Sequence, residues 1–363
     1  MQDKIKNIIV TIGFIVIILG VFITNIIAED KEISTTERRK LAQLPDVSVD
    51  KIIKGDTMKD WDKYATDQFI GRDLFRTIKS FWSMNVFRQK DNNDLFVKND
   101  SIYKMEYPLS TIRIEKSADK INAVYEKYLQ NMNVYYAIIP DKNYYLENDD
   151  HLKFDYEQIK KIMENKLPKM NYIDIWESLE LEDYYKTDLH WKQENLQKVV
   201  EKIQESMNLD STTKVEYTVQ NIGDFYGTYY GQLGLDLPPD KLKVLTNETI
   251  ENCSTYNYEK KKAGKIYEKA TSADKYDIYL SGATPLISIE NPNAKTDKEL
   301  LLFRDSFGSS LAPLLVENYS QITLVDLRYI SSQLLENFID FENQDLDVLF
   351  LYSTVVLNQN VFK

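Results

Sequence analysis

The sequence predicts an α/β protein with three layers, in which helices cover both faces of a mostly parallel sheet. Val134–Ile139 and Leu300–Phe303 are short, unbroken apolar runs, as expected of strands that are buried on both faces. Segments with helical periodicity, such as Asp155–Asn165 and Gln193–Met207, alternate with these runs. Strands separated by helices need crossover connections, which place parallel strands side by side. This alternation is typical of the flavodoxin-like class.

The remaining elements follow the same alternation. Two short runs in residues 94–105 flank Lys98-Asn99-Asp100, which predicts a hairpin. A helix is predicted over Ser117–Met132, and further strands are predicted over Tyr172–Ile175, Ile322–Val325 and Asp347–Tyr352. We therefore expect the α/β domain at residues 94–363. Its section around residues 242–293 is polar and is expected to be an insertion or a set of peripheral strands.

Ile8–Ala28 is an uncharged apolar stretch, long enough at about 1.5 Å of helical rise per residue to span a bilayer. Lysines precede it and acidic residues follow it, so the positive-inside rule places the N-terminus in the cytoplasm. A cleaved signal peptide is the alternative, but its apolar region is usually about 7–15 residues long. We expect residues 1–28 to form a short cytoplasmic N-terminus and a single-pass membrane anchor, with everything after them extracytoplasmic.

Residues 29–93 are expected to form a tether and lead-in helices. Lys31–Pro45 is charged and polar, which is typical of a tether. Apolar residues then recur at roughly helical spacing, with a break at Gly71, and predict one or two amphipathic helices. These residues are Trp61, Tyr64, Phe69, Phe75, Ile78, Phe81 and Trp82. We expect their side chains to form core rather than a ligand platform.

Composition excludes several classes of function. The chain has 363 residues, a formal charge of −12 and a pI near 4.9, which argues against binding a nucleic-acid backbone. Cys253 is the single cysteine and cannot form an intramolecular disulfide. With only two histidines, no zinc-type ligand set can be built, so we expect no structural metal and no cofactor.

Ser306 is a candidate nucleophile. It lies in the turn Arg304-Asp305-Ser306-Phe307-Gly308, after the predicted strand Leu300–Phe303 and before a segment with helical spacing. In open α/β sheets ligands bind at the carboxyl ends of strands, and a helix start offers unpaired N–H groups to a developing negative charge. The alternative is structural, because serine and aspartate are also common helix caps.

A nucleophilic serine needs a base, and His190 is the candidate. Asp188 lies shortly before it, and in an extended segment their side chains would point to the same side. Asp188 could then bind one imidazole nitrogen while the other faces a hydroxyl, which is the arrangement of a Ser-His-Asp triad. A structural pair of His190 and Asp188 is the alternative. The second histidine, His151, follows the polar residues Asn148–Asp150 and is expected at the surface.

The segment Gly223–Gly234 combines glycines with aromatic residues. It is too rich in glycine for regular secondary structure and too aromatic for an idle loop, so we expect it to lie over a site. Its Tyr226, Tyr229 and Tyr230 are candidate stacking walls for a substrate. Its spacing does not match a phosphate-binding glycine loop.

Thr187-Asp188-Leu189-His190-Trp191 and Arg304-Asp305-Ser306-Phe307, behind one membrane segment, resemble the motifs of a known family. The family is that of SGNH-hydrolase-like proteins of the alginate O-acetyltransferase type, and the pattern is most similar to the DHHW-motif proteins. Leu189 stands where that motif has its first histidine, whereas the Asp and His of the triad are retained. Further similar segments are Thr36-Glu37-Arg38, Ile139-Pro140-Asp141-Lys142, Asp224-Phe225-Tyr226-Gly227-Thr228 and Val325-Asp326-Leu327-Arg328-Tyr329.

The resemblance implies an SGNH-hydrolase-like fold and an extracytoplasmic enzyme that transfers acetyl to hydroxyls of a cell-surface or secreted polysaccharide. Ser306 would be the nucleophile that forms the acyl-enzyme, His190 the general base and Asp188 its orienting partner. The backbone N–H groups of Ser306 and its neighbours are the expected oxyanion donors. Candidate substrate-binding residues are Tyr226, Tyr229, Tyr230 and Arg328. A multispanning membrane O-acyltransferase is the implied partner that supplies acetyl.

Two other functions remain open from the sequence. A carbohydrate acetyl esterase would use the same triad, with water in place of the sugar hydroxyl. A membrane-tethered scaffold that binds polysaccharide without catalysis is the third interpretation.

Overall fold

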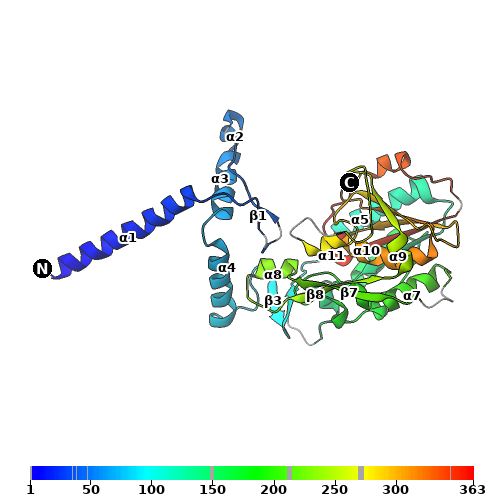
Figure 1. Ribbon diagram of the computed structural model, residues 1–363, viewed down its shortest axis with the longest axis horizontal. Coiled ribbons are helices and arrows are strands. Elements are labelled where there is room, and N and C mark those ends of the chain that lie inside the picture. The colour runs from blue at the N-terminus through cyan, green and yellow to red at the C-terminus, as the bar shows by residue number, and fades with distance from the viewer. Residues whose placement is uncertain are drawn as a thin grey trace. The chain divides into compact units, whose positions relative to one another are not determined.

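The computed structural model describes residues 2–363 apart from residues 35, 38, 47, 148–150, 211–214, 269–273 and 344. The described chain forms two compact units (Figure 1). The first unit comprises residues 1–92 and 230–236, and the second comprises residues 93–229 and 237–363.

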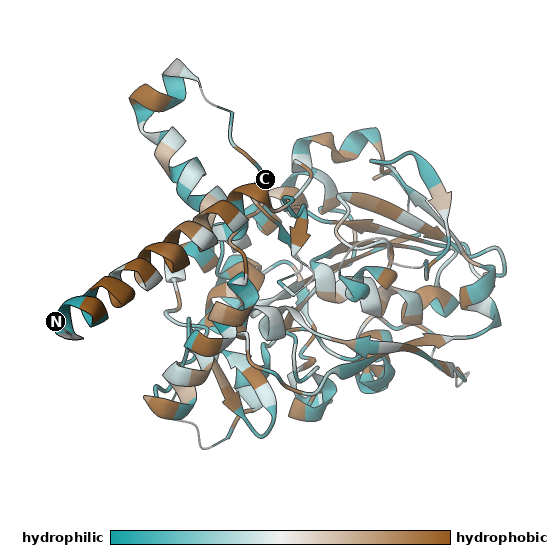
Figure 2. Ribbon diagram, turned by 60° about the vertical axis from the view of Figure 1, so that its left-hand side comes forward, coloured by the Kyte–Doolittle hydropathy of each residue, from teal (hydrophilic) through white to brown (hydrophobic). Residues whose placement is uncertain are grey.

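The first unit begins with the long helix α1, Gln2–Ile27. Its residues Asp3–Ile27 are long and apolar enough to cross a membrane, and Figure 2 shows hydrophobic residues along most of the helix. A signal sequence near the N-terminus has the same properties. An apolar N-terminal helix is therefore present, as the sequence predicts.

The predicted tether contains two short paired strands. β1 (Ile33–Ser34) pairs antiparallel with β2 (Arg39–Lys40). The Arg39 guanidinium donates two hydrogen bonds to the Asp67 carboxylate, at 2.8 and 2.5 Å. The same carboxylate accepts the Ala42 N–H at 2.9 Å. Within the tether predicted over Lys31–Pro45, Arg39 and Ala42 therefore have a specific partner on a helix, Asp67.

Two helices, α3 (Asp56–Asp67) and α4 (Arg72–Phe81), form where the periodicity predicts them and α2 (Val49–Lys54) is additional, but the apolar side chains of α3 and α4 do not form a core. A π-helical turn, Trp82–Val86, continues α4. Gly71, at φ 74°, makes the predicted break before α4. Exposed side chains include Trp61 (40%), Phe75 (58%) and Phe81 (50%). The core expectation is wrong because α4 turns its polar face inward.

The second unit is built on an eight-stranded sheet with the order β10-β9-β11-β13-β12-β14-β5-β6. The bounds are β5 Val134–Ile139, β6 Asn171–Tyr172, β9 Ser254–Asn257, β10 Lys262–Gly264, β11 Leu286–Glu290, β12 Glu299–Arg304, β13 Gln321–Val325 and β14 Leu346–Ser353. β13, β12, β14, β5 and β6 are parallel. β11, β9 and β10 add antiparallel strands at one edge, so the section around residues 242–293 supplies peripheral strands.

The central strands are those that the apolar runs predict. β12 lies between β13 and β14, where Leu301 pairs with Thr323 on one side and Val348 on the other. Leu300–Phe303 is buried, and the Phe303 ring stacks on that of Phe350 with centroids 4.3 Å apart. A strand flanked and covered on both sides has no polar face, which explains its continuous apolar sequence.

Helices precede, connect and follow these strands, on both sides of the sheet. They are α5 (Thr111–Val124, continued by a π-helical turn Tyr125–Leu129), α6 (Tyr156–Lys166), α7 (Gln197–Ser206), α9 (Glu248–Asn252), α10 (Ser306–Leu311) and α11 (Thr354–Leu357). The chain passes from β5 through α6 to β6 in one direction across the sheet, and from β12 through α10 to β13 in the other. Right-handed crossovers then place α6 and α10 on opposite faces.

Smaller elements differ in part from the sequence prediction. The hairpin of β3 (Leu95–Lys98) and β4 (Ser101–Lys104) is confirmed, with Asn99 and Asp100 at φ 50° and 58° in its turn. The strand predicted over Tyr172–Ile175 is shorter, because pairing with β5 ends at Tyr172.

The glycine-rich segment is more regular than expected. It contains the end of β7 (Thr218–Phe225) and all of α8 (Thr228–Leu233), so the absence of regular structure is a wrong prediction. β7 is exposed along most of its length and forms because its backbone pairs with β8 (Asp240–Thr246). Backbone pairing leaves no apolar pattern in the sequence.

Candidate active site

Residues 184–191 form a tight loop that brings Asp188 and His190 together. Tyr184 and Trp191 form an isolated antiparallel bridge, and the Tyr185 N–H donates to the His190 carbonyl at 3.0 Å. Within the loop the His190 N–H donates to Asp188 Oδ1 at 3.0 Å. The two side chains therefore meet through a side-chain-to-backbone turn rather than through the extended segment that the sequence suggests.

Asp188, His190 and Ser306 form a continuous hydrogen-bonded chain. His190 Nδ1 lies 2.5 Å from Asp188 Oδ1, and His190 Nε2 lies 2.7 Å from Ser306 Oγ. Asp188 and His190 are buried, and Ser306 is half-buried. An ionised carboxylate only accepts, so Nδ1 carries the proton and Nε2 of the neutral ring can accept the Ser306 hydroxyl proton. This is the geometry a general base needs.

The imidazole of His190 is held between aromatic rings. The Tyr276 ring stacks on it at a centroid distance of 4.0 Å and an angle of 14°, and the Phe307 ring lies at 4.7 Å. The Tyr276 hydroxyl donates to Ser310 Oγ at 2.9 Å. Burial raises the pKa of Tyr276 well above its ordinary value, so this hydroxyl stays neutral and available as a donor.

Ser306 begins α10, directly beyond β12. Asp305 caps the helix by accepting the Phe307 N–H at 3.0 Å. Its other oxygen accepts the Ser353 N–H at 2.8 Å and the Ser353 hydroxyl at 2.7 Å, which ties the turn to the end of β14. A Cβ on Gly308 would overlap the Arg304 side chain, so this close turn requires glycine.

The cap changes the expected set of oxyanion donors. The Phe307 N–H is bound by the Asp305 side chain, and the Gly308 N–H donates to the Asp305 carbonyl at 3.1 Å. These two neighbours of Ser306 are therefore already engaged, and the expectation that they stabilise an oxyanion is wrong. Among the described hydrogen bonds the Ser306 N–H has no acceptor, so it remains the candidate donor from this turn.

Gly227 and Thr228 support the Asp188 loop from the neighbouring chain segment. The Thr228 N–H donates to Asp188 Oδ2 at 2.6 Å, and the Gly227 N–H donates to Thr187 Oγ1 at 2.8 Å. A Cβ on Gly227 would overlap the Thr187 carbonyl. The glycine thus allows two backbone segments to approach closely enough for Thr228 to bind the carboxylate.

Asp240, at the start of β8, holds the same loop from another side. Its carboxylate accepts the Lys186 N–H at 2.9 Å, the Thr187 N–H at 2.8 Å and the Thr187 hydroxyl at 2.6 Å. Asp240 and Thr187 are both buried. These hydrogen bonds fix the backbone immediately before Asp188.

Lys142 is a buried cation beneath the loop. Its Nζ donates to the carbonyls of Asp188 (2.9 Å), Tyr185 (3.1 Å) and Lys186 (3.3 Å). It also lies 5.0 Å from the Tyr103 ring centroid. Burial disfavours the charged form and lowers the pKa of Lys142 to about 7. When Lys142 is charged, its three N–H bonds match the three carbonyl acceptors.

The predicted substrate-binding residues lie in different surroundings. Tyr226 is 44% exposed. Tyr229 is buried, with its ring centroid 5.2 Å from Lys142 Nζ. Tyr230 belongs to the first unit, where its hydroxyl lies 3.4 Å from Asp236. Arg328 donates from Nε and an Nη atom to the Asp326 carboxylate, at 2.9 and 2.7 Å.

Leu189 and His151, which the sequence also singles out, lie in apolar surroundings. Leu189 is half-buried against the hydrophobic core. His151 is half-buried with its ring stacked on Phe96, so its expected surface position is wrong because β3 offers an aromatic face. Arg38 and Asn148–Asp150 lie outside the described residues.

The sequence does not predict that Lys142, Asp240 and Tyr276 belong to the site. Lys142 lies in a segment that carries the family resemblance, and the Asp224–Thr228 segment likewise contains the glycine that contacts Thr187. Tyr276 lies in a polar stretch without a distinctive pattern. Across the described residues, no cluster of three or more His, Cys, Asp and Glu side chains could hold a metal ion.

Comparisons with solved structures agree with this architecture. A crystal structure of a DHHW family protein from Eubacterium siraeum matches with a TM-score of 0.61 and 20% identity, over 75% of this chain and 94% of that chain. The two share a fold. Bacillus cereus PatB1 with a sulfonyl adduct matches with a TM-score of 0.59 and 21% identity, over 76% of this chain and 99% of that chain.

A second structure of Bacillus cereus PatB1 gives a TM-score of 0.57 at 22% identity. No protein-family model and no curated protein sequence matches the chain. The resemblance to DHHW proteins that the two triad motifs predict is thus supported by a DHHW-like fold, with a large mostly parallel sheet in the second unit.

Proposed function

We propose that this chain is an SGNH-like O-acetyltransferase that moves an acetyl group onto a hydroxyl of a polysaccharide, with Ser306, His190 and Asp188 as its catalytic triad. The single observation that carries the proposal is the chain of hydrogen bonds from Asp188 through His190 to Ser306, at 2.5 and 2.7 Å. The acetyl and polysaccharide parts come from the resemblance to DHHW proteins. PatB1 carries a sulfonyl adduct in its structure, which supports covalent chemistry in this fold.

Acyl transfer would proceed in two steps. The Ser306 proton passes to His190 Nε2 while Oγ bonds to the acetyl carbon, and the leaving group departs with that proton. A sugar hydroxyl then gives its proton to Nε2 and attacks the same carbon, and Nε2 returns that proton to Ser306 Oγ as the bond between Oγ and the carbon breaks. The Ser306 N–H stabilises the oxyanion in both steps.

Two of the predicted substrate residues fit this role from their positions. Tyr226 offers an exposed ring one residue before Gly227, in the segment that supports Asp188. β13 is parallel to its neighbour β12, so the carboxyl ends of the two strands lie at the same edge of the sheet. Arg328 follows β13 and Ser306 follows β12, so both lie along that edge. We assign the buried Tyr229 to support of Lys142 instead of to substrate contact.

The acetyl supplier and the location of the chain belong to the same proposal. The second unit faces the extracytoplasmic side, behind α1 as a single-pass anchor in the cell membrane. A multispanning O-acyltransferase brings the acetyl group across that membrane to Ser306.

An acceptor experiment tests the transferase. The full chain in detergent is given an activated aryl acetate with and without an excess of a neutral oligosaccharide. Acetylated oligosaccharide that is absent from the Ser306→Ala variant is the expected result. Acetate release to water alone, unchanged by the oligosaccharide, would overturn transfer and leave the esterase function. Equal turnover by Ser306→Ala would overturn the triad as well.

A further inference from the structure

The inward face of α4 is polar. Arg72, Arg76 and Ser80 are spaced four residues apart and therefore share one face of the helix. Arg72 forms an ion pair with Glu37. Arg76 and Ser80 each donate at 2.5 Å to backbone carbonyls within residues 231–233. The packed face of α4 is thus held by charged and hydroxyl groups.

The opposite face of α4 is apolar and exposed. At about 100° per residue, five side chains lie together on the side away from the three polar residues. They are Leu74 (61% exposed), Phe75 (58%), Ile78 (43%) and Phe81 (50%) in α4, and Trp82 (49%), the first residue of the π-helical turn that continues it. A helix of a soluble domain normally buries its apolar stripe and exposes its polar face. α4 has the reverse arrangement, so its apolar face needs a partner outside the unit.

The start of α4 lies at the end of α1. Asn25, in the last turns of α1, accepts the Ile70 N–H at 2.8 Å, directly before Gly71. The Tyr64 hydroxyl also donates to the Asp30 carboxylate at 3.0 Å. If α1 spans a bilayer, its end marks the surface of that bilayer, and these hydrogen bonds place the beginning of α4 at the same level.

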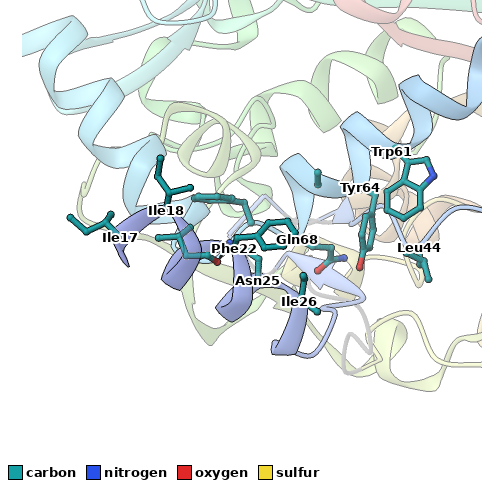
Figure 3. Close-up of a pocket in the computed structure, with 12 residues that line it drawn as sticks. Ile17, Ile18, Phe22, Asn25, Ile26, Leu44, Trp61, Tyr64 and Gln68 are labelled. Atoms are coloured by element: carbon teal, nitrogen blue, oxygen red, sulfur yellow. Dashed lines mark hydrogen bonds between the residues drawn. The ribbon is translucent and has the colours of Figure 1, made fainter. Parts of the chain in front are cut away.

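α3 contributes to the same region through an apolar groove. A cavity of about 750 Å³ lies between α1 and α3, as Figure 3 shows. Ile18 and Phe22 line it from α1. Trp61 lines it from α3, and Phe69 lines it from the segment directly after α3. Apolar surface is therefore continuous from α1 to the residues before α4. None of the three triad residues lines this cavity.

We propose that the apolar face of α4 lies in the lipid interface of the membrane that α1 crosses, so that unit 1 is attached to the bilayer by an interfacial helix as well as by its anchor. Tryptophan and phenylalanine on one face are typical of helices that lie in the plane of the interface. Lys79 is exposed beside the apolar face and suits anionic headgroups. The continuity with α1 favours lipid over a second copy of the chain.

Site-directed spin labelling of the full chain tests this proposal. Phe75→Cys and Phe81→Cys place labels on the apolar face, and Asp73→Cys is the matched control, at an exposed position of the same helix on the side of Arg76 and Ser80. Cys253 is buried and its pKa is raised to about 11 by burial, so the unsubstituted chain serves as the unlabelled blank. The protein is reconstituted into vesicles of phosphatidylcholine and phosphatidylglycerol. Collision rates are measured with oxygen, which concentrates in lipid, and with a water-soluble nickel chelate.

The proposal expects the ratio of oxygen to nickel collisions to be several-fold higher at positions 75 and 81 than at position 73. All three substitutions are at exposed positions, and circular dichroism checks that the variants fold. Equal, nickel-accessible labels at the three positions would overturn the proposal by placing the face in water. Labels at 75 and 81 that are shielded from both reagents would also overturn it. Spin–spin broadening would then show that a second copy covers the face. The readout needs no catalytic activity, so it is independent of the triad.

Discussion

The Asp188 carboxylate is fixed by more than its bond to the imidazole. Oδ1 accepts both the ring Nδ1 and the backbone N–H of His190, and Oδ2 accepts the Thr228 N–H. Because two of these donors are backbone groups, the carboxylate keeps its orientation whether or not the ring moves. It therefore holds His190 with Nε2 toward Ser306.

Substitutions in the triad should behave as one unit. Ser306→Ala and His190→Ala are each expected to lower acetyl release from an aryl acetate by about 10³-fold or more, and the double variant should lose little beyond either. Asp188→Asn should do less damage, because it misorients His190 without removing the base. The steady-state rate of acetyl release is measured for all four variants. Additive losses in the double variant would show that Ser306 and His190 act separately.

Lys142 should make folding stability depend on pH. Burial lowers its pKa to about 7 in the folded chain, below the value of 10.5 for an ordinary lysine. Between these pH values the unfolded chain holds the proton more tightly at this site, so the free energy of unfolding should rise as pH rises from 7 toward 10.5. The contribution of Lys142 is lowest at pH 7 and below.

The Lys142→Met variant isolates this effect. The free energy of unfolding of the original chain minus that of the variant, from urea denaturation, should be larger at pH 9.5 than at pH 7. A difference that does not change with pH would mean that Lys142 keeps an ordinary pKa inside the protein. At either pH the variant removes the Nζ donor that the carbonyls of Tyr185, Lys186 and Asp188 share, at a cost of about 1–3 kcal/mol for an unsatisfied buried group.

At the scale of elements, the close contact between the segment after β7 and the Asp188 loop should be sensitive to substitution. Gly227→Ala would drive a methyl group into the Thr187 carbonyl, and separating the two backbones should cost about 1–3 kcal/mol of stability. It should also lower acetyl release, since the Thr228 N–H would move away from Asp188. Thr228→Ala is the control, because it keeps that N–H. Wild-type rates and melting temperature in Gly227→Ala would contradict the close approach.

The elements that the sequence predicts best are those whose surroundings are uniform. β5 and β12 are buried on both faces, so each appears as a continuous apolar run with clear ends. β7 could not be predicted, because it is exposed and depends on pairing with β8. The amphipathic pattern of α4 predicts a helix correctly. It does not predict which face of the helix is buried, because periodicity does not say what lies outside the chain.

At the scale of the whole molecule, the candidate triad joins segments 116 residues apart in the sequence. Residue types and turn positions were enough to pair Ser306 with His190, because both lie next to the sheet. Lys142, Asp240 and Tyr276 come from three further segments, and their approach to the loop depends on how those segments pack. A single sequence contains no record of such packing.

The orientation of the chain in its membrane is a separate prediction. From lysines before the apolar stretch and acidic residues after it, we predict that everything beyond residue 28 lies on the extracytoplasmic side. Protease added to intact spheroplasts should therefore digest the second unit, as followed with an antibody to it. A cytoplasmic enzyme serves as the control for intact cells. Digestion that begins only after lysis would reverse the orientation.

Acetylation of Ser306 itself is the most direct consequence of the proposed mechanism. The full chain is mixed with an activated aryl acetate, stopped in acid after a short time, and digested for peptide mass spectrometry. The mechanism predicts one acetyl group on Ser306 in the unsubstituted chain and none in the His190→Ala variant over the same time. An unmodified Ser306, or an acetyl group that forms at the same rate without His190, would contradict it.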